Sequence, residues 1–409
     1  MIKVYFIALG CPKNLVDTEK IMGELENKGA IIVSHLKESD VVILNTCGFI
    51  EPALRETRTE IKRLLKSKKK IFVYGCAVNR TRKIWKKEFP DVAGWYFIEE
   101  RDQLIRHIVK KNSRRDARLL TTAGYAYLKI ADGCSNHCSY CTIPFIKGPY
   151  KSIKFDHLLA EARALAGLGV KELILIAQDT ARYGVDLYGK KMLVPLIREI
   201  SQIDGIEWIR LLYLHPRSLD DEIIAEVRNN PKVCKYLEMP LQHINERLLK
   251  LMNRNITKRE IIEKIEKLKG ITLRTTVIVG FPSETEEEFK ELYDFLKAGH
   301  FDWFGVFKYY REKETPAGAW EPLPSQIVNK RFSTMLNLQQ KLIQEKNRQR
   351  LNKTYRVLIH GKNKYYIGHA EFATPEIDGQ VMIKQTKVRI GDFYWCKIKG
   401  MNGADLYGV

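Results

Sequence analysis

The sequence has no long hydrophobic run. A membrane-spanning helix needs an apolar stretch of about 18 residues, and none of the 409 residues lie in an uninterrupted apolar stretch of that length. The first residues, MIKVYFIALG, lack a basic segment ahead of an apolar one, so they do not resemble a secretory signal. We therefore expect a cytoplasmic protein with no membrane partner. With 45% hydrophobic and 29% charged residues, the composition indicates a folded protein of two or three domains.

Acidic residues are too few to balance the basic ones. The chain has 69 Lys and Arg against 49 Asp and Glu, a net charge of +20. The excess lies in the flanks, because residues 1–118 hold 25 basic and 15 acidic residues and residues 347–409 hold 11 and 5. A polyanionic partner such as RNA or a ribonucleoprotein would explain this distribution. A solvated lysine-rich surface explains it equally well.

Six of the eight cysteines form two groups of three, and neither group has a fourth member nearby in the sequence. A disulfide framework is not expected in a cytoplasmic chain of this size, so grouped cysteines indicate metal or redox chemistry. The two remaining cysteines, Cys234 and Cys396, have no partners at useful spacing, and we interpret them as packing residues.

The first 118 residues read as a flavodoxin-like α/β domain. Short runs rich in Val and Ile, typical of buried parallel strands, alternate with segments of helical periodicity. One cysteine follows each of three such runs: Cys11 after FIALG, Cys47 after ILNT and Cys76 after VYG. Because the carboxyl ends of parallel strands share one edge, we expect these three thiols to lie together. The alternative is three small buried side chains, since cysteine packs well.

A second group of cysteines follows a polar stretch, KKNSRRDAR (110–118), that reads as a linker. The segment CSNHCSYC supplies Cys134, Cys138 and Cys141 from one loop directly after a predicted strand. Three thiolates can hold a four-iron cluster with one iron left open for a ligand. A structural zinc site would need a fourth ligand, which His137 could provide.

Residues 119–346 predict a partial (β/α)6 barrel. Six predicted strands alternate with helical segments over about 220 residues, fewer than a complete eightfold barrel needs. The strands are expected at 125–133, 172–178, 207–214, 236–242, 273–281 and 301–309. A long amphipathic helix over about 325–350 follows the last of them.

Residues 347–409 predict a small β-barrel of short strands separated by turns. Basic and aromatic residues interleave there, and such a surface can bind single-stranded nucleic acid. It could equally dock a protein or pack its aromatic side chains inside. The residues concerned are Tyr355, Arg356, Lys364, Tyr365, Tyr366, Tyr394, Trp395 and Lys397.

Together these patterns resemble the radical S-adenosylmethionine (SAM) enzymes, through CSNHCSYC with the aromatic Tyr140 before its last cysteine. Three strand-end cysteines ahead of the barrel and a small barrel behind it resemble the methylthiotransferase branch, whose last domain is called TRAM. LNTCGFIE, AQDT, YLHP and GFPSETEEEF also match that branch. Three stretches resemble its ribosomal-protein members: LGCPKNLVDTE (9–19), TPEIDG (374–379) and DLYGV (405–409). The tRNA-modifying members instead have a sequence closer to GCQMN around the first cysteine.

Three positions depart from the family's usual residues. Ser283 stands where the family often has glycine in GFPGET, and Glu314 where it has the glycine of EGTPA. Lys147 replaces an arginine before Gly148. These differences concern the expected SAM pocket and its loops, and they leave the cysteines untouched.

The resemblance implies two 4Fe-4S clusters. Cys134, Cys138 and Cys141 would hold the cluster that binds SAM, and Cys11, Cys47 and Cys76 a second cluster carrying the sulfur. The implied reaction adds a methylthio group to the β-carbon of an aspartate in small-subunit ribosomal protein number twelve and uses two SAM molecules. Radical chemistry is required because no side-chain base can deprotonate a methylene carbon.

Two other functions stay open at this point. One is a tRNA adenosine methylthiotransferase, and the other is a non-catalytic RNA- or ribosome-binding protein with structural metal sites. An electron donor such as flavodoxin or ferredoxin is implied, the sulfur donor is not indicated, and nothing in the sequence demands more than a monomer.

The resemblance also suggests residues around SAM. Tyr140 would lie against the adenine, Gln178 and Asp179 would meet the amino group, Gln242 would reach the ribose, and Gly280 would allow the backbone to approach the adenine. For each of these residues a purely structural role is the alternative. His215 and His243 are interpreted as hydrogen-bonded structural residues.

Overall fold

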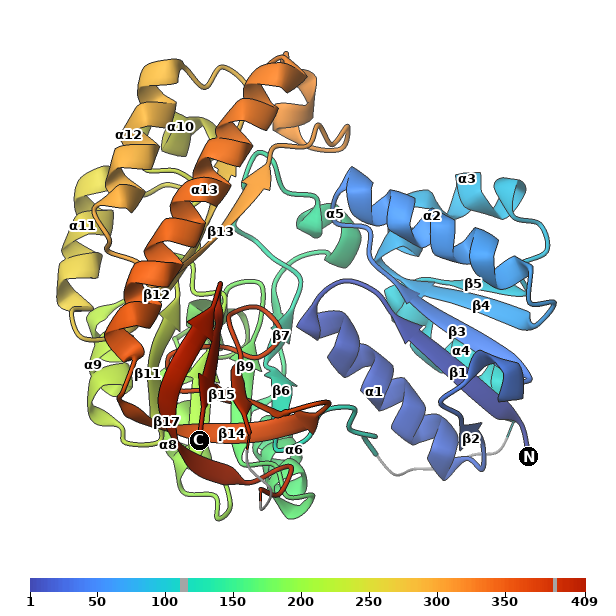
Figure 1. The fold of residues 1–409 in the computed structure, drawn as a ribbon. Helices are drawn as coiled ribbons and strands as arrows, with labels where there is room; N and C mark the ends of the chain where they lie inside the picture. The colour runs from blue at the N-terminus through green and yellow to red at the C-terminus, as the bar shows by residue number, and fades with distance from the viewer. Residues whose placement is uncertain (111–116, 385–387) are drawn as a thin grey trace.

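A computed structural model describes residues 1–110, 117–384 and 388–409. It has an N-terminal α/β domain, a larger central α/β domain and a small C-terminal barrel, as Figure 1 shows. Most of the predicted linker at 110–118 lies outside the described residues. Within the described residues, no helix is long and apolar enough to cross a membrane.

The N-terminal sheet is fully parallel and has the strand order β2-β1-β3-β4-β5. This order is the flavodoxin-like one, so the prediction of that fold is confirmed. The strands are β1 (Lys3–Ala8), β2 (Ile31–Ile32), β3 (Val41–Thr46), β4 (Lys70–Gly75) and β5 (Gly94–Tyr96).

Two helices cover each face of this sheet. The helices are α1 (Pro12–Asn27), α2 (Glu51–Leu65), α3 (Cys76–Glu88) and α4 (Arg101–Ile108). Alternation along β3 divides its apolar side chains between them, so that Val42 packs with α2 and α3 whereas Ile43 packs with α1 and α4. Both faces of the sheet are therefore buried, as parallel sheets require.

The central sheet has six parallel strands in the order β13-β12-β11-β10-β9-β6 and does not close on itself. The predicted partial barrel is confirmed. Its strands are β6 (Tyr125–Lys129), β9 (Glu172–Ile176), β10 (Trp208–Leu211), β11 (Val233–Glu238), β12 (Thr272–Val279) and β13 (Trp303–Lys308). A short antiparallel pair, β7 (Ala131–Asp132) and β8 (Lys151–Ser152), follows β6.

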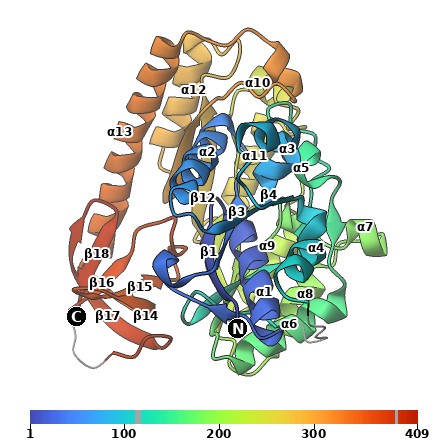
Figure 2. The same cartoon turned by 90° about the vertical axis from the view of Figure 1, so that its right-hand side faces the viewer.

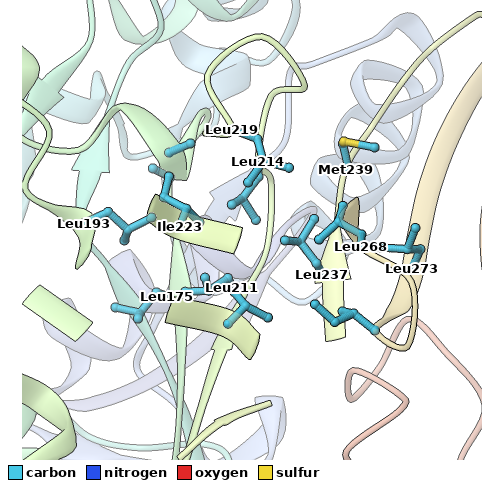
Figure 3. Close-up of a cluster of buried hydrophobic side chains, with 14 of the residues drawn as sticks. Leu175, Leu193, Leu211, Leu214, Leu219, Ile223, Leu237, Met239, Leu268 and Leu273 are labelled. Atoms are coloured by element: carbon cyan, nitrogen blue, oxygen red, sulfur yellow. The ribbon is translucent and has the colours of Figure 1, made fainter. Parts of the chain in front are cut away.

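Helices pack on the convex face of the central sheet. They are α6 (Phe155–Gly167), α8 (Leu193–Ser201), α9 (Asp221–Asn229), α10 (Glu246–Leu251), α11 (Lys258–Lys267), α12 (Glu286–Lys297) and α13 (Ser325–Arg350). Two short helices lie elsewhere: α5 (Ile143–Lys147) contacts α3, and α7 (Val185–Tyr188) contacts β8. Leu175, Leu211 and Leu237 of three neighbouring strands form one layer with Leu193 and Ile223 of the helices (Figure 3). This layer belongs to the largest apolar core of the molecule.

The C-terminal residues form a closed five-stranded barrel in the order β14-β15-β16-β18-β17. Its strands are β14 (Thr354–Lys362), β15 (Tyr366–Ala370), β16 (Val381–Ile383), β17 (Phe393–Asn402) and β18 (Asp405–Gly408). In Figure 2 the long helix α13 leads down to this barrel. The predicted domain boundary at 346 falls inside α13.

The C-terminal barrel covers the concave face of the central sheet. Trp208, Tyr236 and Trp303, which point away from the outer helices, share a core with Val357 and Leu358 of β14. The TPEIDG segment reaches the same face, where Tyr125 and Tyr236 donate hydrogen bonds to Glu376 and Asp378, at 2.9 and 2.7 Å.

Candidate active site

The cysteines of the first group lie where three neighbouring strands of the N-terminal sheet end. Cys47 and Cys76 follow β3 and β4 directly, and Cys11 comes three residues after β1. Glycines allow the strand-end loops to touch: a Cβ on Gly10 would lie 2.7 Å from the Cβ of Cys47, and one on Gly48 would lie 2.7 Å from the Cα of Ala77. Gly10 also has φ +92°, which other residues rarely adopt.

Asn14 ties the three strand ends together. Its Nδ2 donates to the carbonyl oxygens of Leu9 and Thr46, at 3.0 and 2.9 Å, and its Oδ1 accepts a hydrogen bond from the thiol of Cys76 at 3.6 Å. Asn45 in turn donates to the backbone oxygen of Asn14 at 2.9 Å. One buried amide in the CPKN stretch thus fixes the relative positions of the three loops.

The loop of the second group follows β7 and is anchored on the end of α10. Ser139 donates its hydroxyl to Leu251 O at 2.8 Å and its amide to Met252 O at 3.1 Å, and Asn253 donates to His137 O at 2.9 Å. His137 itself is exposed. These hydrogen bonds at His137 and Ser139 therefore fix the loop that carries Cys134, Cys138 and Cys141.

The thiols are free, and several are buried. Burial raises the pKa of Cys47 to about 11 and that of Cys76 to about 12, and it also raises the pKa values of Cys134 and Cys141. Backbone amides two residues further along, at Phe49, Asn136 and Ile143, oppose this rise for Cys47, Cys134 and Cys141. Bound iron would complete the stabilisation of the thiolates.

This donor set fits an iron–sulfur cluster at each group. Each group offers three sulfurs from short loops with amides directed at them, and such amides help to set the potential of a cluster. Arg254, which is buried, donates to the sulfur of Cys138 at 3.6 Å. Over the described ranges, no three Cys, His or acidic side chains converge as ligands of a single metal ion.

The loops that carry the two cysteine groups are hydrogen-bonded to each other. Thr142, next to Cys141, donates its hydroxyl to Phe49 O at 2.7 Å, and Asn79 of α3 donates to Ile146 O of α5 at 2.8 Å. Arg80 donates to Gly48 O at 2.7 Å and pairs with Glu312 at 2.8 Å. Hydrogen bonds and an ion pair thus join the N-terminal and central domains next to the two cysteine groups.

Buried ion pairs lie beside this contact between the two domains. Lys129 pairs with Asp17 and Asp132, and Lys147 pairs with Asp132 at 2.9 Å. Lys13, also buried, reaches across to the central sheet, where its Nζ lies 3.4 Å from Ala177 O and 3.5 Å from the ring centroid of Tyr213. Burial lowers the pKa of Lys13, and a thiolate at Cys11 would oppose that shift.

A model of the radical SAM superfamily matches residues 128–296, a model of the uncharacterized protein family UPF0004 matches residues 3–96, and a TRAM domain model matches residues 353–409. These three matches coincide with the central sheet, the N-terminal sheet and the C-terminal barrel.

Relatives align over the full length. Ribosomal protein uS12 methylthiotransferase RimO of Acetivibrio thermocellus is 42% identical, and the alignment covers 99% of this chain and 98% of the relative. The protein of the same name from Caldicellulosiruptor saccharolyticus is 40% identical, with 100% and 99% covered. The chain belongs to the radical SAM methylthiotransferase family. It is therefore an enzyme, and family membership implies SAM and a 4Fe-4S cluster.

Solved structures share the fold of this methylthiotransferase at low identity. The radical SAM methyltransferase TsrM from Kitasatospora setae, with cobalamin and a [4Fe-4S] cluster bound, has a TM-score of 0.56 at 16% identity, and the match covers 77% of each chain. The cobalamin-dependent radical SAM enzyme OxsB has a TM-score of 0.52 at 12% identity over 84% of this chain and 56% of its own.

Of the residues that the sequence suggested for SAM, Tyr140 belongs to the loop of the second cysteine group and Asp179 is hydrogen-bonded to that loop. Tyr140 is half-buried beside Phe281, and Gln178 is half-buried at the end of β9. Asp179 is fully buried and already accepts hydrogen bonds from Asn136 at 3.0 Å and Ser218 at 2.6 Å. The SAM contacts of these residues remain predictions.

Gln242 and Gly280 have backbone constraints of their own. Gln242 has φ +74° and bridges to Val277 of β12. A Cβ on Gly280 would lie 2.6 Å from Val328 of α13, so helix packing by itself already requires glycine there. Neither observation tests a contact with the ribose or adenine of SAM.

The other singled-out residues lie in structural surroundings. Cys234 and Cys396 are fully buried in the core between the central sheet and the C-terminal barrel. His243 is buried 3.3 Å from Glu284, and His215 accepts the amide of Arg217 at 3.2 Å. Burial lowers the pKa of His215 to about 2, so its imidazole stays neutral.

The three departures from the family's usual residues each have a local partner. Ser283 has φ +65°, a conformation that suits the family's glycine, and its hydroxyl accepts from Arg247 at 3.1 Å. Glu314 pairs with Arg80 at 2.7 Å, and Lys147 pairs with Asp132.

Sequence reasoning did not assign roles to Lys13, Asn14, Arg80 and Arg254. Lys13 and Asn14 lie inside the CPKN stretch, which was noted as a whole motif, so the motif was the available signal. Arg80 and Arg254 meet partners that are 232 and 116 residues away in the sequence, and no local pattern indicates such contacts.

Proposed function

We propose that this enzyme adds a methylthio group to the β-carbon of an aspartate in ribosomal protein uS12. The observation that carries the proposal is the full-length identity of 40–42% to proteins named uS12 methylthiotransferases. Two groups of three free cysteines support it, since a methylthio transfer needs both a radical centre and a sulfur source.

In this proposal each cysteine group holds one 4Fe-4S cluster. Cys134, Cys138 and Cys141 hold the cluster that binds SAM, and Cys11, Cys47 and Cys76 hold the second. When bound, the clusters and SAM supply the one-electron chemistry that removes hydrogen from an unactivated carbon and the sulfur that replaces it. The open position at each group follows from the missing fourth cysteine.

Hydrogen bonds within the chain fix the loops that carry the two cysteine groups. Asn14 fixes the three loops of the first group, and Ser139 fixes the loop of the second. The hydrogen bond from Thr142 to Phe49 connects the loops that carry the two groups.

Product mass tests the proposed function. Anaerobically prepared enzyme, a one-electron reductant such as reduced flavodoxin or ferredoxin, sulfide and SAM are incubated with uS12 and, separately, with tRNA. We expect the mass of uS12 to increase by one methylthio group in place of hydrogen, and tRNA to remain unchanged. A methylthio group on tRNA alone would contradict the proposal and assign the enzyme to the tRNA-modifying branch.

Single cysteine variants test the division of labour between the two groups. We expect Cys11→Ala to retain SAM cleavage and to lose sulfur transfer, whereas Cys138→Ala loses both. Cys396→Ala, which changes a core cysteine far from both groups, is the control and should retain both. Loss of SAM cleavage in Cys11→Ala would show that the assignment of the two groups is wrong.

A further inference from the structure

Lys13 is a buried cation without a carboxylate partner. It is 4% exposed, and its one hydrogen-bond acceptor among the described residues is Ala177 O, at the long distance of 3.4 Å. An ammonium group has three protons to donate. Burial of a charge that lacks an ionic partner is unfavourable by several kcal/mol.

The other buried lysines of this region are paired. Lys129 contacts Asp17 and Asp132, and Lys147 contacts Asp132 and, at 3.8 Å, Asp17. In contrast, no carboxylate oxygen of the described part of the chain lies within 4 Å of Lys13 Nζ. The fold therefore neutralises two buried lysines by direct contact, whereas the buried carboxylate of Glu238 attracts Lys13 only from beyond 4 Å and leaves its ammonium without a contacting anion.

Lys13 connects the loop of the first cysteine group with the central sheet. It comes two residues after Cys11, and its Nζ ends beside Ala177, the residue before Gln178 at the end of β9. The ammonium also stacks on the ring of Tyr213, which is half-buried. Asp179, two residues after Ala177, accepts a hydrogen bond from Asn136 in the loop of the second cysteine group, so the end of β9 connects Lys13 with that loop.

Tyr213 is held rigidly beneath the ammonium. Its backbone has φ +61°, which is unfavourable for a residue with a side chain and persists only where surrounding contacts enforce it. Its carbonyl oxygen accepts from the amide of Thr180 at 3.0 Å, and its own amide donates to Glu238 at 3.3 Å. Strained backbone at a strand end beside a buried charge is typical of a ligand site.

We propose that Lys13 binds the side-chain carboxylate of the aspartate that is modified. This inference rests on the proposed function, because it assigns a residue to the substrate of that reaction. The carboxylate carbon is bonded directly to the β-carbon, so one charge-assisted hydrogen bond from Lys13 fixes the carbon that reacts. Lys13 is thus a positioning residue that distinguishes aspartate from its amide.

The test is a binding measurement with variants on both partners. Fluorescence anisotropy gives the Kd of labelled uS12 for the anaerobic holoenzyme, using native uS12 and uS12 in which the modified aspartate is replaced by asparagine. We expect the wild-type enzyme to bind the asparagine form about 10- to 100-fold more weakly, the range for a hydrogen bond between charged groups. Lys13→Met should weaken binding of the aspartate form by a similar factor and should bind both forms alike.

Lys20→Met is the matched control. Lys20 lies on the same helix, α1, but is paired with Glu161 on the outer side. This variant should discriminate between the two forms of uS12 as the wild type does. Lys13→Gln is a second variant, and an iron content equal to that of the wild type shows that either protein is folded.

The outcomes separate the inference from the proposed function. Equal discrimination by Lys13→Met and wild type would overturn the role of Lys13, as would a wild type that binds both forms of uS12 alike. A wild type that methylthiolates tRNA and does not bind uS12 would overturn the proposed function and the role of Lys13 together.

Discussion

At the scale of single residues, the cysteines could be predicted and their supports could not. Each cysteine of the first group follows a strand that its Val and Ile content reveals, and parallel strands end at one edge. Asn14 gives no comparable signal, because its three partners, Leu9, Thr46 and Cys76, come from three different loops. Tertiary hydrogen bonds of this kind depend on the folded backbone and leave no periodic pattern.

Replacement of Asn14 by aspartate tests its role. In Asn14→Asp a carboxylate would face the carbonyl oxygens of Leu9 and Thr46, which lose their donor in a buried site. We expect the free energy of unfolding in urea to fall by about 2–4 kcal/mol, because two buried acceptors are left without partners. Asn402→Asp, at the exposed end of β17, is the control and should change it by less than about 0.5 kcal/mol. Equal stability of Asn14→Asp and wild type would show that the three loops hold without this amide.

At the scale of elements, long periodic segments were predicted correctly and short ones were missed. All six central strands and helix α13 lie where the sequence patterns indicate. In contrast, β2 has two residues, β5 three and β18 four, too few to show a period. These short strands complete the sheet order and close the small barrel, so the details of topology came from the structure.

The contact between α3 and the segment after β13 leads to a second prediction. The side chain of Arg80 is 7% exposed and pairs with Glu312, which is 2% exposed. In Arg80→Met the carboxylate of Glu312 would remain buried without its counter-charge, and we expect a loss of about 3–5 kcal/mol in stability. Hydrogen exchange should become faster at Gly48 and Phe49 in particular, since Arg80 also holds the carbonyl of Gly48.

The matched control is Arg82→Met on the same helix. Arg82 pairs with Glu100 within the N-terminal domain and is partly exposed, so its loss should leave exchange at Gly48 and Phe49 unchanged. Unchanged exchange in Arg80→Met as well would contradict a role for Arg80 in joining the two domains.

At the scale of the whole molecule, the C-terminal barrel has a structural role that its sequence did not reveal. Of the basic and aromatic residues singled out there, Tyr355, Tyr366 and Tyr394 pack on the shared core, whereas Lys364, Trp395 and Lys397 are exposed. The packing interpretation is therefore confirmed for the three tyrosines, and the binding interpretation stays a prediction for the exposed residues. Glu376 and Asp378 of TPEIDG bond to tyrosines of the central sheet, so this stretch holds the two parts together.

Stability against acid tests this union of domains. Burial would raise the pKa of Glu172. Arg210 of β10 and His369 of the C-terminal barrel outweigh burial and hold this pKa at about 2. Glu172→Gln leaves Arg210 buried and unpaired, so we expect a loss of about 3–5 kcal/mol near pH 7. Because the pKa in the folded state lies below the ordinary value of 4.5, this contribution is complete above pH 4.5 and is lost as the pH falls towards 2.

Urea denaturation at several pH values measures this effect. The difference in stability between wild type and Glu172→Gln should narrow as the pH falls from 4.5 towards 2. Glu207→Gln, which removes a half-exposed partner of Arg356 at the same interface, should cost less than about 1 kcal/mol. A difference that grows on acidification would contradict the assigned ion pair.

The covered concave face also bears on how the chain is made. Proteins are synthesised from the amino end, and domains fold as they emerge from the ribosome. The six strands of the central sheet are complete once β13 has emerged, yet Trp208, Tyr236 and Trp303 stay uncovered until residues 353–409 follow. During that interval the nascent chain exposes aromatic surface and the Arg210 charge. The nascent chain is therefore most prone to aggregation just before its last domain is translated.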